Sequence, residues 1–185
     1  MNKANVTTGK RRTAGGIYRA PAGTTLPTDA STSLAAAFKE VGYISEDGVT
    51  NSVGKTIQEI KEWGGEVVDS ELTEQSDQWK FKEIESLNLD TLKSVFGDSN
   101  VSESSGAITV TVKAEITGSG VWAIDMAQKG GRLKRIVIPD GKITSLGDIV
   151  YKGSEAVGYD VTLTAHYDTS IGGTHKEYIS AAPTS

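Results

Sequence analysis

Two short stretches of this chain have the residue types and spacing of known chemical sites. Residues 118–123 read GSGVWA, which matches the dinucleotide-binding pattern G-x-G-x-x-A, and Asp140 follows at a suitable distance. The glycines of that pattern bind a pyrophosphate only where a helix starts directly behind them. The residues after Gly120 instead alternate like a strand, so we interpret these glycines as a hairpin turn.

The second stretch contains one of the two histidines. His166 and Asp168 share the polar face of an expected strand, and His175 follows, so the residue types of a metal site are present. No further ligand in the sequence converges on these residues. We therefore interpret His166 as a surface residue.

Carboxylates and serines offer no stronger candidate for catalysis. The pairs Glu46-Asp47 and Glu83/Glu85 lack the aromatic cleft and the spacing that glycoside hydrolysis would require. The G-x-S-x-G elbow of serine hydrolases does not occur in the sequence. The sequence therefore predicts no enzyme, and no catalytic, cofactor-binding or metal-binding residue.

Composition narrows the class of protein further. The 185 residues suffice for one domain with a hydrophobic core. With 19 Lys and Arg against 24 Asp and Glu, the net charge of −5 argues against a protein that grips nucleic-acid phosphates. Cysteine is absent, which excludes disulfides and thiolate metal sites. We expect neither a secretory signal nor a membrane anchor.

Alternating apolar and polar residues predict an antiparallel β-structure. The two clearest alternations span residues 108–117 and 157–168. Weaker strand patterns occupy residues 42–45, 64–70, 77–86, 121–126, 132–138, 148–153 and 176–180. We expect residues 108–117 to pair with residues 121–126 across the Gly118-Ser119-Gly120 turn, and a second turn at Pro139-Asp140-Gly141. The polar residues 45–61 predict a long loop between strands.

Helical spacing occurs in two places. In residues 87–97, Leu89, Leu92 and Phe96 share a stripe, Asn88 is a suitable N-cap, and Gly97 suits the C-terminal end. Leu87 could pack on Leu92 as a hydrophobic staple. Residues 31–42 carry a second stripe of Leu34, Phe38 and Val41.

These elements predict a mainly β fold, an antiparallel β-sandwich or open barrel with one flanking α-helix. We divide the chain into an extended N-terminal arm, residues 1–30, and a β-sandwich domain, residues 31–185. The arm includes Lys10-Arg11-Arg12, which could touch phosphate. Since the whole chain is acidic, we interpret these residues as part of a tail that docks on a neighbouring subunit.

From Gly15 onward the chain resembles the major tail tube proteins of long non-contractile-tailed bacteriophages, the siphovirus type. Residues 16–48, GIYRAPAGTTLPTDASTSLAAAFKEVGYISEDG, are similar to the opening of that family, in particular Tyr18, Ala20-Pro21 and Leu26-Pro27-Thr28-Asp29. The stretches IKEWGGEVV and YDVTLTAHYDTSIGGTHKEY are also similar to it. The order and spacing of these stretches, more than any single motif, carry the resemblance.

The resemblance implies a structural virion protein with no cofactor. Six copies would form a ring, their inner sheets would join into a barrel, and stacked rings would make a tube through which DNA passes without specific binding. Further partners would be the tape measure, tail terminator and distal tail proteins. The chain would be made in the cytoplasm of a bacterial host and would function in the phage tail.

Two sets of residues follow from this interpretation. We expect contacts between subunits or rings from Tyr18, Arg19, Pro21, Glu46, Asp47, Lys55 and Trp63. Acidic side chains on polar strand faces would line the channel and repel DNA phosphates; the candidates are Glu83, Glu85, Glu115 and Asp160.

Two alternatives stay open at this point, the first of them from a different class of protein. One is a β-sandwich binding module, Ig-like or carbohydrate-binding, although only 6% of the residues are aromatic and the tryptophans are far apart in sequence. The other is the tube protein of a phage-tail-like injection or secretion system, which would use the same assembly physics.

Overall fold

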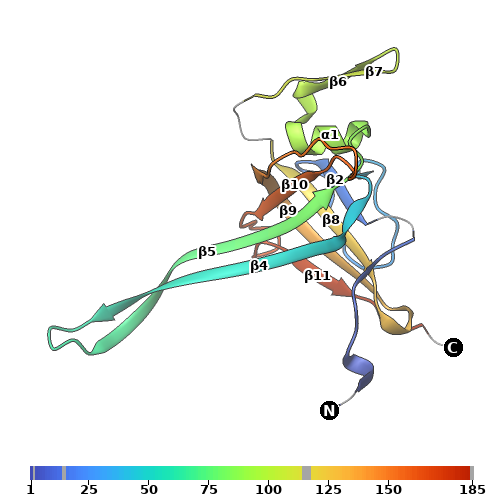
Figure 1. The fold of residues 1–185 in the computed structure, drawn as a ribbon. Helices are drawn as coiled ribbons and strands as arrows, with labels where there is room; N and C mark the ends of the chain where they lie inside the picture. The colour runs from blue at the N-terminus through green and yellow to red at the C-terminus, as the bar shows by residue number, and fades with distance from the viewer. Residues whose placement is uncertain (2, 14–15, 114–117, 184–185) are drawn as a thin grey trace.

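An antiparallel sheet of nine strands forms most of the molecule (Figure 1). The computed structural model describes residues 1, 3–13, 16–113 and 118–183. The sheet has the order β3-β2-β8-β9-β10-β5-β4, while β1 pairs with β8 and β11 pairs with β9. Its strands are β1 (Lys10–Arg11), β2 (Ile17–Pro21), β3 (Lys39–Glu40), β4 (Ile44–Lys61), β5 (Val67–Glu83), β8 (Gly120–Ala127), β9 (Leu133–Leu146), β10 (Tyr159–Ala165) and β11 (Lys176–Ile179).

The remaining elements are small and lie beside the sheet. Helix α1 (Leu89–Phe96) packs on it, and β6 (Val101–Ser104) pairs with β7 (Ala107–Val110) in a separate hairpin. The other elements among the described residues are three short 3-10 helices: η1 (Lys3–Asn5), η2 (Asp98–Asn100) and η3 (Lys129–Gly131). The expected mainly β, antiparallel fold with one α-helix is therefore confirmed in the described part of the chain, and the sheet there is not closed into a barrel.

Strand β9 continues through residues 139–141, where the sequence predicted a turn. Its first half lies between β8 and β11, and its second half, from Gly141 to Leu146, pairs with β10. A side chain at Gly141 would approach Trp122 to 2.6 Å and Leu163 to 3.0 Å, so the two halves can meet only at a glycine. The indole nitrogen of Trp122 also donates a hydrogen bond to the Gly141 carbonyl over 3.2 Å.

The core has two parts. The larger cluster is made by alternate residues of β5, β8, β9 and β10 and by one face of α1, and Trp122, Ile138 and Leu163 are among its fully buried members. The smaller cluster packs Leu34 and Phe38 against Ala20 and Val121. Strand β2 thus lies within the body, and the expected N-terminal arm contributes β1 and β2 to the sheet of its own chain.

Helix α1 forms where its sequence signals predict it. The side chain of Asn88 accepts a hydrogen bond from the Asp90 amide over 2.9 Å, and Gly97 with φ 94° ends the helix. The expected hydrophobic staple is wrong, because Leu87 is 87% exposed. The helix is held instead by burial of Leu92 and Val95 and by a polar contact with β5.

That polar contact places a carboxyl group inside the protein. Glu83 is fully buried, and both of its oxygens lie within 3.1 Å of the Ser94 hydroxyl. Ser94 has one hydroxyl proton, and the Thr91 carbonyl oxygen lies 2.7 Å away, well placed to accept it. A protonated Glu83 would then donate to Ser94, in agreement with burial, which raises the pKa of Glu83 to about 8 against the opposing effects of Ser94 and Arg19.

The buried carboxyl group predicts a loss of stability as the pH rises. Because the folded-state pKa lies above the ordinary 4.5, the contribution of Glu83 to stability is greatest below pH 4.5 and falls as the pH rises to about 8. Each pH unit in that window costs at most about 1.4 kcal/mol. We expect Glu83→Gln to remove this slope in urea unfolding at pH 5, 7 and 9. Glu71→Gln on the exposed surface is the control, and an unchanged slope in Glu83→Gln would contradict the assignment.

The helix expected at residues 31–42 does not form. The Asp29 side chain accepts hydrogen bonds from the amides of Ser31 and Thr32, both over 2.6 Å, which fixes a turn at the start of this segment. At its other end, Lys39 and Glu40 pair with β2 as strand β3. Because an isolated helix of this length is marginal, these tertiary contacts decide its conformation.

Three further expectations about strands are wrong. Residues 45–61 are not a loop but most of strand β4. Residues 148–153 contain no strand. The segment 107–110 pairs with β6, whereas residues 120–127 pair with β1, β2 and β9, so the expected hairpin between residues 108–117 and 121–126 is not formed by the described residues. Residues 114–117 of that expected strand lie outside the described residues.

Candidate assembly surfaces

A long hairpin, formed by β4 and β5, extends well beyond the body (Figure 1). Every residue from 50 to 76 is exposed, and about twelve residue pairs at ~3.3 Å each give a projection of roughly 40 Å. A two-stranded hairpin without a packing partner is marginally stable in water. The hairpin is therefore the part of the molecule that most needs a surface to lie on.

The two sides of the hairpin differ in chemistry. The register places Val53, Ile57 and Leu72 on the side that continues the buried face of Trp79 and Phe81, and these three side chains are at least half exposed. A bulge at residue 73 keeps Leu72 opposite Ile57. The opposite side is polar, with β5 contributing the carboxylates Asp69, Glu71 and Glu74. Val53, Ile57 and Leu72 thus form an apolar stripe on one side, which also carries Lys55 and Glu59, whereas the other side carries the three carboxylates of β5 together with Ile60.

A buried carboxylate fixes the hairpin where it leaves the body. Asp77 is 1% exposed and accepts hydrogen bonds from Asn51 (2.7 Å), Thr174 (2.7 Å) and the Nδ1 atom of His175 (2.5 Å). The His175 ring also meets Trp79 edge to face at 5.2 Å. These contacts join both strands of the hairpin to the loop before β11, so they set the direction in which the hairpin projects.

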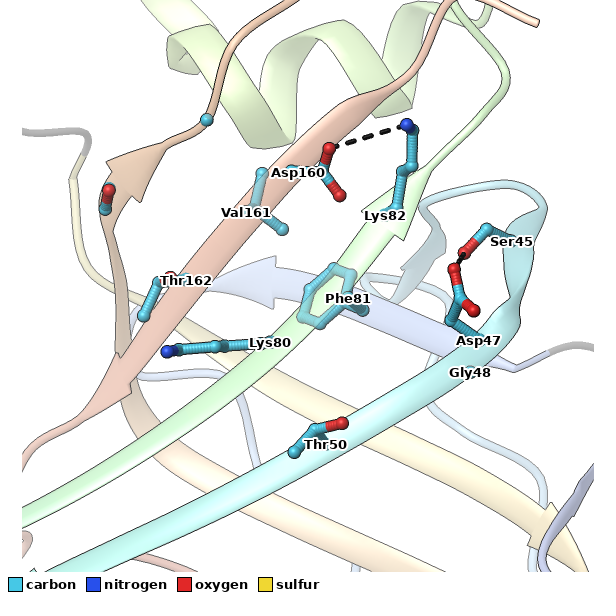
Figure 2. Close-up of a pocket in the computed structure, with 12 residues that line it drawn as sticks. Ser45, Asp47, Gly48, Thr50, Lys80, Phe81, Lys82, Asp160, Val161 and Thr162 are labelled. Atoms are coloured by element: carbon cyan, nitrogen blue, oxygen red, sulfur yellow. Dashed lines mark hydrogen bonds and ion pairs between the residues drawn. The ribbon is translucent and has the colours of Figure 1, made fainter. Parts of the chain in front are cut away.

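A polar groove lies beside this base, on the outer face of β4, β5 and β10 (Figure 2). It has a volume of about 320 Å³ and is lined by hydroxyl groups, two lysines and two carboxylates. Lys82 pairs with Asp160 at 3.4 Å, and the Ser45 hydroxyl donates to Asp47 over 3.4 Å. Its charges of both signs make this a hydrated surface that continues the polar side of the hairpin.

Comparison with known proteins identifies the family. The sequence model of the family described as phage tail tube protein matches residues 2–182. The chain belongs to this family. It is therefore a structural protein of the phage tail, and the resemblance found in the sequence is confirmed.

Other comparisons with this tail tube protein are more distant. No curated protein matches the chain. Among solved structures, the cryo-EM structure of the anti-feeding prophage cap, a tube terminating cap, is similar over 97% of each chain with 8% identity and a TM-score of 0.47.

The expected contact residues of the tail tube protein lie in three places. Tyr18, Arg19 and Pro21 are in β2, where Arg19 makes a bidentate ion pair with Asp98 at 2.8 and 3.0 Å. Glu46 and Asp47 lie at the start of β4, near the polar groove. Lys55 is on the projecting part of β4, and Trp63 is fully exposed in the turn between β4 and β5. The structure thus brings only Lys55 and Trp63 together on one projecting element, and their contact role stays a prediction.

The expected channel carboxylates are also scattered. The buried Glu83 has no access to a channel. Glu85 accepts hydrogen bonds from the Tyr43 amide (2.8 Å) and the Asn88 side chain (2.7 Å), so it caps the approach to α1. Glu115 lies outside the described residues. Asp160 is exposed in the polar groove, and of the three candidates among the described residues it has the most open position.

The residues first considered for dinucleotide or metal binding do not have the geometry of such sites. Gly120 opens strand β8 and not a helix, so the geometry of a dinucleotide site is missing there. Ser119 donates a hydrogen bond to Asp140, and His166 lies 3.9 Å from the same carboxylate. Within the described residues, no group of three His, Asp or Glu side chains could hold a metal ion, and none of the helices is long and apolar enough to span a membrane.

Sequence reasoning missed the residues that make the hairpin two-sided. Val53, Ile57 and Leu72 alternate with polar residues, but charges and a bulge interrupt the pattern. The available signal was the pair of residues Gly64-Gly65 between two segments rich in β-branched residues, which is typical of a hairpin turn. Val67, Val68 and the residues after Trp79 were assigned to separate strands, whereas all belong to β5.

Proposed function

We propose that this chain is the repeating subunit of the phage tail tube, and that six copies form a ring that stacks into a channel for genome delivery. The exposed two-sided hairpin carries the proposal, because one copy cannot bury Val53, Ile57 and Leu72. Burial of exposed apolar area contributes about 25 cal/mol per Å², so a neighbouring copy that covers these side chains stabilises both hairpin and assembly.

Strand pairing supports a ring as the form of assembly. Strand β4 is at an edge of the sheet, and along its outer side the described residues offer no partner strand. An edge strand of 18 residues exposes a row of backbone hydrogen-bonding groups, which favours pairing with another chain. A closed ring of identical copies satisfies every such edge without leaving a free one.

Charge supports a role for the acidic side of the hairpin in the channel. If the apolar side packs on a neighbour, the side with Asp69, Glu71 and Glu74 remains in water. Carboxylates on the wall of a channel repel DNA phosphates, so DNA moves past without adhesion. In this proposal these three residues and Asp160 line the channel. The tape measure, tail terminator and distal tail proteins are its partners in the virion.

Electron microscopy of the purified protein tests this function. We expect hollow filaments of uniform width whose number rises with protein concentration. A cryo-EM reconstruction should show sixfold rings, with Glu71 and Glu74 facing the channel and Ile57 and Leu72 covered by a neighbour. A protein that stays monomeric at every concentration would contradict assembly, and a reconstruction with the apolar side toward the channel would contradict the arrangement.

A further inference from the structure

The tip of the hairpin presents an unusual side chain to solvent. Trp63 lies in the turn between β4 and β5 and is fully exposed, so its indole contacts essentially nothing in its own chain. Exposure of a tryptophan ring to water is unfavourable, and buried tryptophans contribute much of the binding energy of many protein interfaces. Glu62 and Glu66 stand on either side of Trp63, and the Glu62 carboxylate accepts a 3.4 Å hydrogen bond from the Glu66 amide. The tip is therefore an aromatic residue flanked by negative charges.

Positive charge is concentrated at the other end of the sequence. Residues 1–28 contain five basic residues and no acidic residue, whereas residues 59–74 contain six acidic residues and one lysine. The basic residues are Lys3, Lys10, Arg11, Arg12 and Arg19. Arg11, Arg12 and Arg19 pair with carboxylates of their own chain, but Lys10 makes no ion pair with a described residue.

A groove lies beside Lys10, where the N-terminal segment crosses the end of β8. It has a volume of about 470 Å³ and is lined by Val6, Thr7, Thr8, Lys10, Ala127, Gln128 and Lys129. Two contacts hold the segment in place: Lys10 pairs with Ala127 in the sheet, and the Lys129 amide donates to Thr7 over 2.9 Å. Lys129, like Lys10, is exposed and makes no ion pair with a described residue. The groove thus combines the apolar side chains of Val6 and Ala127 with the positive charges of two lysines.

The two surfaces match in chemistry but cannot meet within one copy. The hairpin carries its tip to the left in Figure 1, whereas the turn that joins β8 to β9 and contains Lys129 lies at the lower right. We infer that Trp63 of one subunit inserts into the groove of a neighbouring subunit, with Glu62 and Glu66 paired to Lys10 and Lys129. The inference rests on the proposed function, since it needs copies that assemble.

A second copy is the favoured occupant because each chain carries both complementary surfaces. A contact between two different surfaces of identical chains is heterologous, and it propagates to a ring or a filament without a second protein. The contact explains the basic N-terminal segment and the acidic hairpin together, although the whole chain is only mildly acidic. It also places the tip charges against lysines, where they would otherwise repel a neighbour's hairpin.

Charge reversal on each surface separately tests the inference. We expect Glu62→Lys/Glu66→Lys and Lys10→Glu/Lys129→Glu each to raise the critical concentration for filaments at least about tenfold. An equimolar mixture of the two variants should assemble better than either alone, because the reversed charges attract again. Trp63→Ala should also raise the critical concentration, and Trp63→Phe should recover part of the loss. Glu103→Lys/Asp148→Lys makes the same change of net charge as the hairpin variant, at exposed positions elsewhere, and should assemble normally.

The outcomes separate this contact from the function on which it rests. All substituted residues are exposed, so unchanged thermal unfolding is expected and would show that the variants fold. Filaments of wild type and of both reversal variants at the same critical concentration would overturn the contact and leave the tail tube function standing. A mixture that assembles no better than the single variants would overturn the pairing of these charges. Absence of wild-type filaments would overturn both proposals.

Discussion

Replacement of residues 55–75 by a two-residue Asn-Gly turn is expected to abolish tube formation and leave a folded monomer. The new turn would join Gly54 to Ser76, which are opposite each other in the register, and Asn-Gly suits a tight hairpin. The deleted residues are all exposed, and the Asp77 contacts at the base are kept. The core therefore loses nothing, whereas assembly loses its main apolar surface. Electron microscopy and analytical ultracentrifugation measure the two results.

Substitutions within the full-length hairpin separate surface chemistry from length. Ile57→Ser/Leu72→Ser should raise the critical concentration for filaments at least about tenfold. Ile57 and Leu72 are 61% and 50% exposed in one copy, and the variant no longer offers their apolar area for burial against a neighbour. The matched control is Gln58→Ser/Glu71→Ser, one strand position away on the polar side, which should still form filaments. Normal tubes from the shortened hairpin would refute the role of the hairpin in assembly.

Arg135→Met is expected to give a large loss of folding stability. Arg135 is 2% exposed and makes bonds of 2.7 and 2.8 Å to the buried Asp125, and it also donates to the carbonyls of Asp29 and Thr32. Removal of one partner of a buried ion pair costs about 3–5 kcal/mol, because the other charge stays buried. Arg12 still pairs with Asp125 over 2.9 Å in this variant, so we expect a loss at the lower end of that range. At about 2–4 °C per kcal/mol for a chain of this size, a loss of about 3 kcal/mol lowers the melting temperature by roughly 6–12 °C.

Two comparison variants make the stability test specific. Lys134→Met removes an ion pair with Glu177 that is partly exposed, and it should cost less than about 1 kcal/mol. In Arg135→Met/Asp125→Leu no carboxylate is left at position 125, so part of the lost stability should return. If calorimetry gives Arg135→Met and Lys134→Met similar melting temperatures, the buried pair does not hold the segment of residues 29–32 on the sheet.

The fold was predictable from sequence wherever a local pattern faced a core. Strand β10 and helix α1 show this, because Val161 and Leu163 alternate toward one side and Leu92 and Val95 lie on one helical face. In these elements the conformation that the local sequence favours is also the one that buries the apolar side chains in the core. The segment 31–42 shows the opposite. Its apolar residues have helical spacing, but the turn at Asp29 and the pairing of β3 with β2 stabilise a different conformation.

The candidate assembly site was less predictable because its residues are exposed in one copy. Trp63 and Lys55 were expected to contact neighbouring subunits, and both project on the hairpin, but the strand character of residues 45–61 was missed. A half-buried strand is recognised by strict alternation of apolar and polar residues. In this segment charged residues interrupt the apolar side, so the alternation is not visible in the sequence. The burial of Glu83 was missed for a related reason, since its neighbours in sequence do not show that α1 covers it.

By itself the sequence determined the class of fold, the family resemblance and the balance of charge, because composition and periodicity are properties of the chain alone. Only the tertiary structure decided that β9 continues through residues 139–141 and that β4 and β5 form one projecting hairpin. It also decided that Asp77 meets His175, almost a hundred residues away in sequence. Pairings of this kind depend on which distant segments pack together, and their free energy is absent from any local window of residues.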